Sequence, residues 1–184
     1  TCPPVSTYPD KDALLQDLAG RLDDTGQPRP TAIVIGALGR VGTGAADLCE
    51  AMNVQTTRWD MAETASGGPF PEILRHDIFL NCIFARPGTP VFVPQSAVTT
   101  ERSLSVIGDV ACDPDSDYNP VPVYSEATTW TAPVTRVHDD PPLDIMAIDN
   151  LPSLLPLESS QDYAAQLLPS LLALDELDAG VWSR

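Results

Sequence analysis

Positive charge is scarce in this chain. Lys and Arg number 10 against 26 Asp and Glu, which gives a formal net charge of −16. A surface of this sign repels the phosphate backbone of nucleic acids and the anionic headgroups of lipids. We therefore expect no nucleic-acid partner, and we interpret the acidic excess as a solvated surface.

Long apolar segments are also absent. No run approaches the roughly 20 apolar residues that a helix needs to span a bilayer, and no basic start followed by an apolar stretch marks a secretory signal. We expect no membrane partner and a cytoplasmic location. Because the chain begins at Thr1 and not at Met, a truncation, a proteolytic fragment and a designed form all stay open.

Residues suited to metal binding are few and scattered. The four cysteines, Cys2, Cys49, Cys82 and Cys112, form no C-x-x-C pair and have no His at ligand spacing. We therefore expect no metal site, no disulfide framework and a reducing compartment. Cys49 and Cys82 lie in apolar stretches and are interpreted as small core residues.

Motifs of the common hydrolytic and nucleotide-cleaving enzymes are missing. The two histidines, His76 and His138, have no Ser or Cys partner in a recognisable motif and are interpreted as surface residues. The patterns G-x-S-x-G, H-E-x-x-H and G-x-x-x-x-G-K-[ST] do not occur, so serine hydrolases, zinc proteases and P-loop enzymes have no support.

What the sequence does contain is an alternation of short apolar runs and helical patterns. Strands are predicted at Thr31 to Ile35, Val54 to Trp59, Asp77 to Cys82, Leu104 to Ile107 and Leu143 to Ile148, with weaker candidates near Thr129 and at Val134 to Val137. Helices are predicted at Asp12 to Asp23 with Asp10 as N-cap, at Arg40 to Met52, near Gln95 to Thr99, and at Glu158 to Leu174 with an interruption at Pro169. We expect an α/β fold, a Rossmann-like doubly wound parallel sheet in a three-layer αβα arrangement.

The strongest local signal is a glycine cluster after the first predicted strand. Gly36, Gly39, Gly42 and Gly44 follow that strand, and the segment from Ala37 fits G-x-G-x-x-G with Ala in place of the first Gly. Glycines allow a tight reversal and a close approach of N–H groups to a pyrophosphate, which the positive end of the next helix attracts. The alternative is that these glycines serve only the turn and its packing.

An acidic residue favours a dinucleotide. Asp60 follows the second predicted strand about 20 residues beyond Gly39, where a carboxylate accepts hydrogen bonds from an adenosine ribose. It would repel a 2′-phosphate, which favours NAD over NADP, although nearby Arg58 keeps NADP open. Asn81 to Phe84 and Gly108 to Val110 follow later strands at the edge where such sheets bind ligands. A solvated Asp60 and ordinary strand ends are the alternatives.

Six blocks of sequence follow the order of a known family and cover nearly the whole chain. They are G-A-L-G-R-V-G-T-G-A (Gly36 to Ala45), W-D-M-A-E-T (Trp59 to Thr64), G-G-P-F-P-E-I (Gly67 to Ile73), D-I-F-L-N-C-I (Asp77 to Ile83), N-P-V-P-V-Y (Asn119 to Tyr124) and A-I-D-N-L-P-S-L-L-P (Ala147 to Pro156). In these blocks the chain resembles the lysine-forming saccharopine dehydrogenases. The wider kin are alanine dehydrogenases and the NAD domain of transhydrogenases.

The resemblance implies an NAD-dependent oxidoreductase acting on CH–NH donors, which converts saccharopine to lysine and 2-oxoglutarate. In reverse, this reaction completes lysine biosynthesis by the aminoadipate route. The resemblance also implies two Rossmann-like domains with the cleft between them. Matching motifs imply cofactor contacts by Gly39 and Arg40 at the pyrophosphate, Asp60 and Thr64 at the ribose, Phe84 and Val110 along the groove, and Ile148, Asp149, Asn150 and Leu151 near the nicotinamide.

The chain also departs from the family. Val41 stands where the fungal pattern has Cys, so a disulfide to Cys82 cannot form, and Asn150 stands where that pattern has His. The family's catalytic Lys and His and its substrate-binding arginines belong to an N-terminal domain, whereas the one lysine here is Lys11. We therefore expect no catalytic residue in this chain, which alone would bind cofactor without turnover.

The resemblance implies three parts: an N-terminal linker and connecting helix (1–30), an NAD-binding domain (31–156), and a C-terminal helix and tail (157–184) that returns to the missing N-terminal domain. Without that domain, an apolar patch favouring a homodimer is expected at Leu167, Leu168, Leu171, Leu172 and Leu174. The alternatives are a regulatory NAD-binding module without catalysis, an alanine-dehydrogenase-like enzyme, and a Rossmann-type methyltransferase that holds S-adenosylmethionine.

Overall fold

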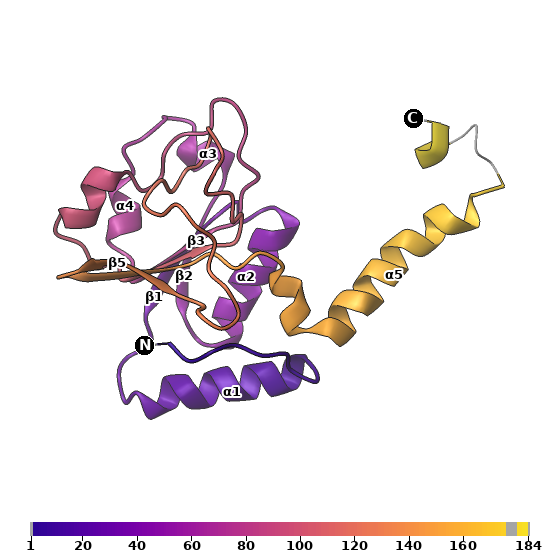
Figure 1. Ribbon diagram of the computed structural model, residues 1–184, viewed down its shortest axis with the longest axis horizontal. Helices are drawn as coiled ribbons and strands as arrows, with labels where there is room; N and C mark the ends of the chain where they lie inside the picture. Colours follow the sequence, from indigo (N-terminus) through magenta and orange to yellow (C-terminus); the bar gives the residue numbers. More distant parts are fainter. Residues whose placement is uncertain (1, 176–179, 184) are drawn as a thin grey trace.

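A computed structural model describes residues 2–175 and 180–183 of the chain. Its centre is a six-stranded sheet with the order β2-β1-β3-β4-β6-β5 (Figure 1). The strands are β1 (Thr31–Ile35), β2 (Gln55–Trp59), β3 (Ile78–Asn81), β4 (Val106–Asp109), β5 (Thr135–Asp139) and β6 (Pro142–Met146). Five of them run parallel, and β5 pairs antiparallel with β6 at the edge. The predicted α/β parallel sheet is confirmed, with one antiparallel strand added.

The longer helices begin and end close to their predicted positions. They are α1 (Lys11–Asp24), α2 (Arg40–Ala51) and α5 (Pro156–Leu172), and the shorter ones are α3 (Met61–Thr64), α4 (Pro71–Leu74), η1 (Gln95–Thr99), η2 (Leu151–Leu154) and η3 (Gly180–Ser183). The Asp10 side chain caps α1 as predicted, because it accepts a hydrogen bond of 2.8 Å from the Ala13 N–H.

Different elements cover the two faces of the sheet. Alternate residues of β1 point to opposite sides, so Ala32 faces α1 and α2 while Ile33 faces the other core. That larger core is built by Phe70 near α4, by η1 and by the loops after β3 and β4, and it includes the fully buried Phe79. One outer layer is therefore helical, and the other consists of short helices and loops.

Three sequence predictions are corrected. The fourth strand was expected at Leu104 to Ile107 but begins two residues later, because the Leu104 N–H bonds to Leu74 O and the pairing with β3 starts at Val106. Near Thr129 there is only an isolated bridge, between Thr128 and Ile148. Helix α5 continues through Pro169, because a proline removes one main-chain donor and the other turns of a long exposed helix keep theirs.

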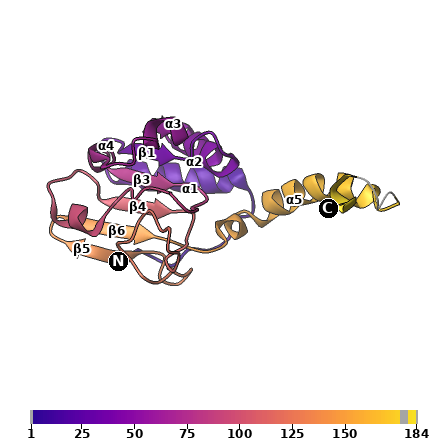
Figure 2. The ribbon, with the colours of Figure 1, turned by 90° about the horizontal axis from the view of Figure 1, so that it is seen from above.

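Helix α5 projects away from the sheet (Figures 1 and 2). None of its described residues is buried. Four of the five leucines predicted to form an apolar patch, Leu168, Leu171, Leu172 and Leu174, are exposed by 45–72%, and Leu167 is half-buried. The predicted apolar surface is therefore present on α5 and just beyond its end. Residues 176–179 and 184 of the predicted C-terminal tail lie outside the described residues.

Candidate functional site

The segments that the sequence singled out meet at one edge of the sheet. The last residue of β1, Ile35, pairs with Trp59 of β2 and with Asn81 of β3, and Asn81 pairs with Asp109 of β4. All four strands end level, so the turns that follow them are neighbours. β2 lies on one side of β1, and β3 lies on the other side, so the strand order reverses next to β1. Open α/β sheets bind ligands at such a point.

Two glycines after β1 are required by packing. Gly36 has φ +87°, and a Cβ there would lie 2.8 Å from the carbonyl oxygen of Cys82. A Cβ on Gly42 would lie 2.0 Å from the carbonyl oxygen of Gly36. Gly42 is therefore required for the close packing of the start of α2 against the turn after β1. The requirement at Gly36 was not predicted, and its signal was its place directly after the last residue of β1.

Gly39 occupies a different position in the turn. It is the N-cap of α2 and provides no side-chain cap for the helix, and it is exposed. The first main-chain N–H groups of a helix have no partner within the helix and carry part of its positive dipole. The start of α2, at Gly39 and Arg40, can therefore accept an anionic group without displacing a capping side chain.

Asp60 joins the glycine turn to the end of β2. Its Oδ2 accepts a hydrogen bond of 2.9 Å from the main-chain N–H of Leu38, and its Oδ1 accepts one of 2.9 Å from Met61. Its own N–H donates to Glu63 Oε2 at 2.7 Å, which completes a capping box on α3. The Thr64 hydroxyl donates to the Asp60 carbonyl at 3.0 Å. Since a carboxylate offers about four lone-pair sites, Asp60 retains capacity for further donors.

Exposed apolar side chains surround this turn. Leu38 is 84% exposed, Met61 is 70% exposed and Phe84 is 91% exposed. They follow β1, β2 and β3, so they lie on three neighbouring turns of the same sheet edge. Val110 follows β4, where its N–H donates to the carbonyl of Asn81 at 3.0 Å. Apolar surface gathered beside polar main-chain groups is typical of a ligand groove.

A buried polar network lies beneath this edge. Asn81 and Asp109 are 0% and 1% exposed, and Asn81 Nδ2 donates to Asp109 Oδ1 at 2.9 Å. The Tyr124 hydroxyl donates to Asp109 Oδ2 at 2.8 Å. Burial, together with the nearby Asp109 carboxylate, raises the pKa of Tyr124 well above its usual value. Asn81 and Asp109 were predicted at strand ends, as the structure has them, whereas Tyr124 was not predicted and its signal was its place in a family block.

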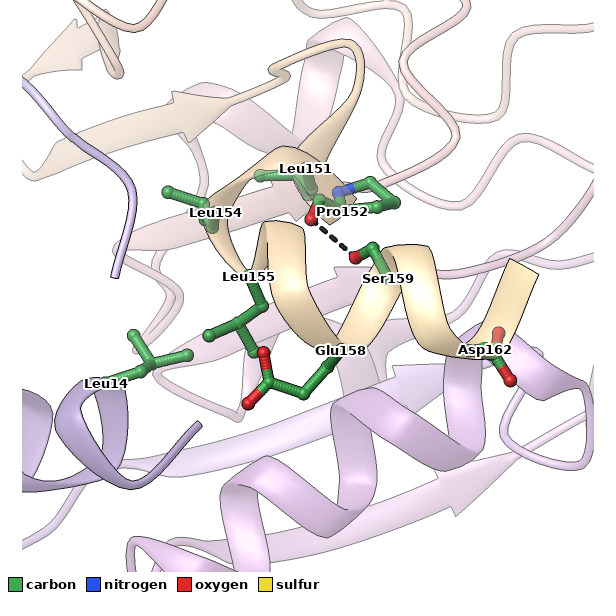
Figure 3. A pocket seen from close by; sticks show the side chains of 8 residues that line it. All are labelled: Leu14, Leu151, Pro152, Leu154, Leu155, Glu158, Ser159 and Asp162. Atoms are coloured by element: carbon green, nitrogen blue, oxygen red, sulfur yellow. Dashed lines mark hydrogen bonds between the residues drawn. The ribbon is translucent and has the colours of Figure 1, made fainter. Parts of the chain in front are cut away.

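The segment after β6 forms the far end of the edge. Ile148 is buried, whereas Asp149 and Asn150 are exposed, and Asn150 adopts a left-handed conformation with φ +66° before η2. Leu151 begins η2 and lines a hollow of about 340 Å³ between α1 and the start of α5. Figure 3 shows Leu14 of α1 facing Leu155 and Glu158 across this hollow, with Asp162 further along α5.

Arg40 makes contacts that the sequence did not predict. Its guanidinium pairs with the Asp162 carboxylate, and it donates a hydrogen bond of 2.7 Å to Gln166 Oε1. The Gln166 amide in turn donates to Asp162 Oδ2 at 2.8 Å. The residue expected at the pyrophosphate is thus held by α5, more than 100 positions away in the chain. No local sequence pattern could have indicated that pairing.

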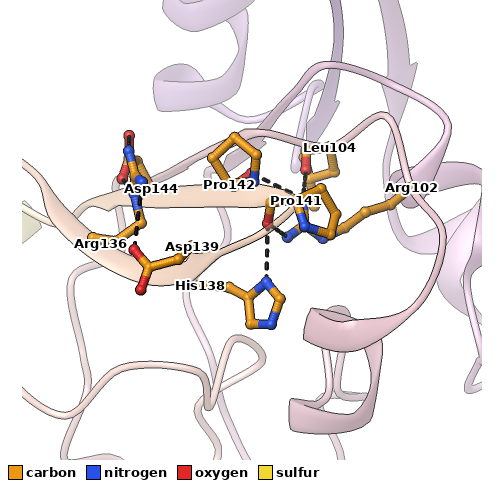
Figure 4. Close-up of polar contacts among 8 residues, drawn as sticks. All are labelled: Arg102, Leu104, Arg136, His138, Asp139, Pro141, Pro142 and Asp144. Atoms are coloured by element: carbon orange, nitrogen blue, oxygen red, sulfur yellow. Dashed lines mark hydrogen bonds and ion pairs between the residues drawn. The ribbon is translucent and has the colours of Figure 1, made fainter.

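The histidines lie away from this edge. His76 is half-buried, and its ring nitrogens bond with the Thr57 hydroxyl and with the Glu72 carbonyl, each at 2.8 Å. His76 is thus a partly exposed residue that links β2 to α4, a role that the sequence did not predict. His138 donates to the carbonyl of Pro141 at 2.9 Å in the turn between β5 and β6, beside the Arg136 ion pairs (Figure 4).

Within 2–175 and 180–183, no three His, Cys, Asp or Glu side chains come together in a way that could hold a metal ion. Over the same residues, no helix combines the length and the hydrophobicity needed to cross a membrane. The four cysteines are free, with Cys2 exposed and Cys49 buried.

Comparison with known proteins places this geometry in context. No protein-family model matches the chain. It is 46% identical to the saccharopine dehydrogenase (NAD(+), L-lysine-forming) of Yarrowia lipolytica, over 99% of the chain and 52% of that protein. Identity is 43% to the protein of the same name from Candida albicans and 41% to that from Schizosaccharomyces pombe, covering 50% and 53% of those proteins. The chain therefore spans about half the length of these relatives, and the resemblance inferred from its motifs is confirmed.

Proposed function

We propose that this chain is the NAD-binding half of a lysine-forming saccharopine dehydrogenase. Support comes from relatives named lysine-forming saccharopine dehydrogenase, which match 99% of the chain at 41–46% identity. The observation that carries the proposal is the uncapped start of α2 at Gly39 next to the Asp60 carboxylate. An anion and a ribose are the two groups that these features suit, and a dinucleotide holds them side by side.

The residues around the turn take distinct roles in this proposal. The first main-chain N–H groups of α2 and the Arg40 guanidinium meet the pyrophosphate, because one offers hydrogen-bond donors and the other a cation. The N–H of Gly39 itself donates to the Gly36 carbonyl at 3.1 Å, and Gly39 contributes by letting the ligand approach the backbone closely. Asp60 accepts hydrogen bonds from the ribose hydroxyls, and Thr64 supports it from α3. The same carboxylate disfavours a 2′-phosphate, so NAD is preferred to NADP. Arg58, two positions before Asp60, pairs with Glu50 on α2 at 3.4 Å.

The remaining sheet edge would hold the rest of the cofactor. The exposed ring of Phe84 and the main chain at Val110 line the groove. Ile148, Asp149, Asn150 and Leu151 follow β6 and lie toward the nicotinamide end, where Asp149 and Asn150 are exposed. When bound, NAD supplies the hydride acceptor for oxidative deamination, and this chain's contribution is to bind and orient it.

Hydrogen bonds join the beginning of the chain to the region around the start of α5. The Tyr8 N–H donates to the Leu154 carbonyl at 2.8 Å, and the Lys11 N–H donates to Glu158 Oε1 at 2.5 Å. The beginning of the chain, at Tyr8 and Lys11, thus meets the chain again at Leu154 and Glu158, where the 31–156 domain ends, as two linkers to a second domain would. We place the catalytic residues in that second domain, and we propose that it, or a second copy in a homodimer, covers the leucines of α5. A cytoplasmic location fits the four free cysteines.

Ligand titration of the isolated chain tests the cofactor assignment. We expect NADH to bind in calorimetry, NADPH to bind more weakly, and S-adenosylmethionine not to bind. A rise in melting temperature with S-adenosylmethionine but not with NADH would reject the proposal in favour of a methyltransferase-type fold.

The activity requires a second experiment. We expect the chain alone to show no turnover of saccharopine, and we expect NADH formation from saccharopine and NAD when the chain is joined to the other half found in its relatives. A joined protein that binds NADH but oxidises alanine and not saccharopine would favour the alanine-dehydrogenase-like alternative. Binding without turnover of either substrate would favour a regulatory module.

A further inference from the structure

A carboxylate of the chain itself lies beside Arg40, at the start of α2. The Asp162 carboxylate of α5 pairs with Arg40, and Gln166 bonds to both partners, so the three side chains form a closed set. A hollow of about 390 Å³ beside them is lined by Arg40, Pro152, Ser159, Asp162, Tyr163 and Gln166. Asp162 therefore stands where a carboxylate competes with any other anion for the same guanidinium.

The strength of this competition can be judged from exposure. The Arg40 and Asp162 side chains are 67% and 56% exposed, so solvent screens their attraction and a single phosphate oxygen is a comparable partner. A diphosphate, which also receives the main-chain N–H groups at the start of α2, has more to offer than Asp162 does. The pair can hence be broken by a diphosphate at a modest cost in affinity.

We propose that Asp162 is an affinity-setting residue of the cofactor site, which holds Arg40 in the absence of ligand and must release it when a diphosphate binds. The inference rests on the proposed function, because it takes Arg40 as a ligand of the pyrophosphate. It adds a residue of α5 that sequence motifs do not assign to the site. Asp162 therefore opposes binding of the diphosphate of the ligand and does not affect binding of its adenosine.

Release of Arg40 would also alter α5. The helix buries none of its described residues, so few contacts fix its direction. Those with Arg40 lie near its middle, at Asp162 and Gln166, and the bond from the Lys11 N–H to Glu158 lies nearer its start. Because coupling between two equilibria is reciprocal, a diphosphate that displaces Asp162 loosens the hold of the domain on α5. The linker toward the other half would then respond to cofactor.

Asp162→Asn tests the inference with little change in shape. In calorimetry at low salt, we expect this variant to bind NADH and ADP about two- to fivefold more tightly than the unaltered chain, the range given by exposed ion pairs. Adenosine, which lacks phosphate, should bind both proteins equally. The gain should shrink at 0.5 M salt. Asp175→Asn, which removes one charge just beyond the same helix, is the matched control and should leave all affinities unchanged.

A double-mutant cycle with Arg40→Ala separates the local pairing from a general charge effect. We expect Arg40→Ala to weaken NADH binding and Asp162→Asn to have no effect in its presence. The inference is overturned if Asp162→Asn binds NADH no more tightly than the unaltered chain, or if the gain persists without Arg40. In either case the proposed function stands, because NADH still binds. A folded chain that binds neither NADH nor ADP would reject both.

Discussion

The hydroxyl of Tyr124 donates a hydrogen bond of 2.8 Å to Oδ2 of Asp109, a side chain that is 1% exposed. Asn81 donates to the other carboxylate oxygen at 2.9 Å. The bond ties Tyr124, midway along the connection from β4 to β5, to the last residue of β4. Next to Asp109, the Val110 N–H donates to the Asn81 carbonyl at 3.0 Å, so both residues are held at the same edge of the sheet.

Removing the Tyr124 hydroxyl tests this network. Tyr124→Phe should lower the free energy of unfolding by about 1–3 kcal/mol, because Asp109 loses a donor in a buried site. Urea denaturation measures the change. Tyr163→Phe on α5, where the ring is 67% exposed, is the control and should have no measurable effect. Equal stabilities for the two variants would contradict the role given to the bond.

The two glycines of α2 allow a matched comparison. Gly42→Ala should destabilise the chain by at least about 1–3 kcal/mol, because its Cβ would lie 2.0 Å from the Gly36 carbonyl oxygen and the turn must move. Gly44→Ala in the same helix meets nothing within 4 Å, so it should stabilise by about 0.5–1 kcal/mol through helix propensity. Thermal melts of both variants decide the matter, and similar melting temperatures would argue against close packing at Gly42.

Because the Cys82 thiol is largely buried, we expect the free energy of unfolding to fall at alkaline pH. Burial, with a further contribution from Asp109, raises its pKa from 9.0 to about 12. Below pH 9 the thiol is protonated in both states and the shift has no effect. Above pH 9 the unfolded chain loses this proton and the folded chain keeps it, so the free energy of unfolding falls by about 1.4 kcal/mol per pH unit for this group.

Denaturation at several pH values between 8 and 11 measures the decline. Cys82→Ala should make the decline shallower, whereas Cys2→Ala, which alters an exposed thiol, should leave it unchanged. A slope that is the same in both variants would show that Cys82 does not keep its proton in the folded chain. Cys49 and Cys112, whose pKa values burial also raises, contribute to the decline that remains.

Asp60 should affect both ligand and fold. Asp60→Ala should weaken NAD binding by about 1–3 kcal/mol, the usual effect of losing hydrogen bonds to a charged group. It should also destabilise the chain, because the Leu38 and Met61 N–H groups lose their acceptor. Glu63→Ala breaks the same capping box but keeps the Asp60 carboxylate, so it should lower the melting temperature without weakening NAD binding. Unchanged NAD affinity in Asp60→Ala would refute the ribose contact.

Local sequence was a reliable guide wherever a single element decided the outcome. The apolar run Thr31–Ile35 forms β1 with the predicted ends, since a buried parallel strand needs a continuous apolar segment. The residues after each parallel strand were correctly expected to meet at one edge, since parallel strands end on the same side. Pro169 shows the opposite case, because a propensity that breaks many helices is outweighed here by the turns on both sides of it.

By itself, the sequence determined the parallel sheet and the order of the turns that follow its strands, and therefore which turns surround Gly39 and Asp60. Only the tertiary structure decided which side chains those turns hold: Asp60 accepts from Leu38, 22 positions away, and Arg40 pairs with Asp162, 122 positions away. The physical reason is that strand and helix formation follow from periodic patterns of neighbouring residues. Hydrogen bonds between distant side chains depend instead on how complete elements pack, which no local pattern records.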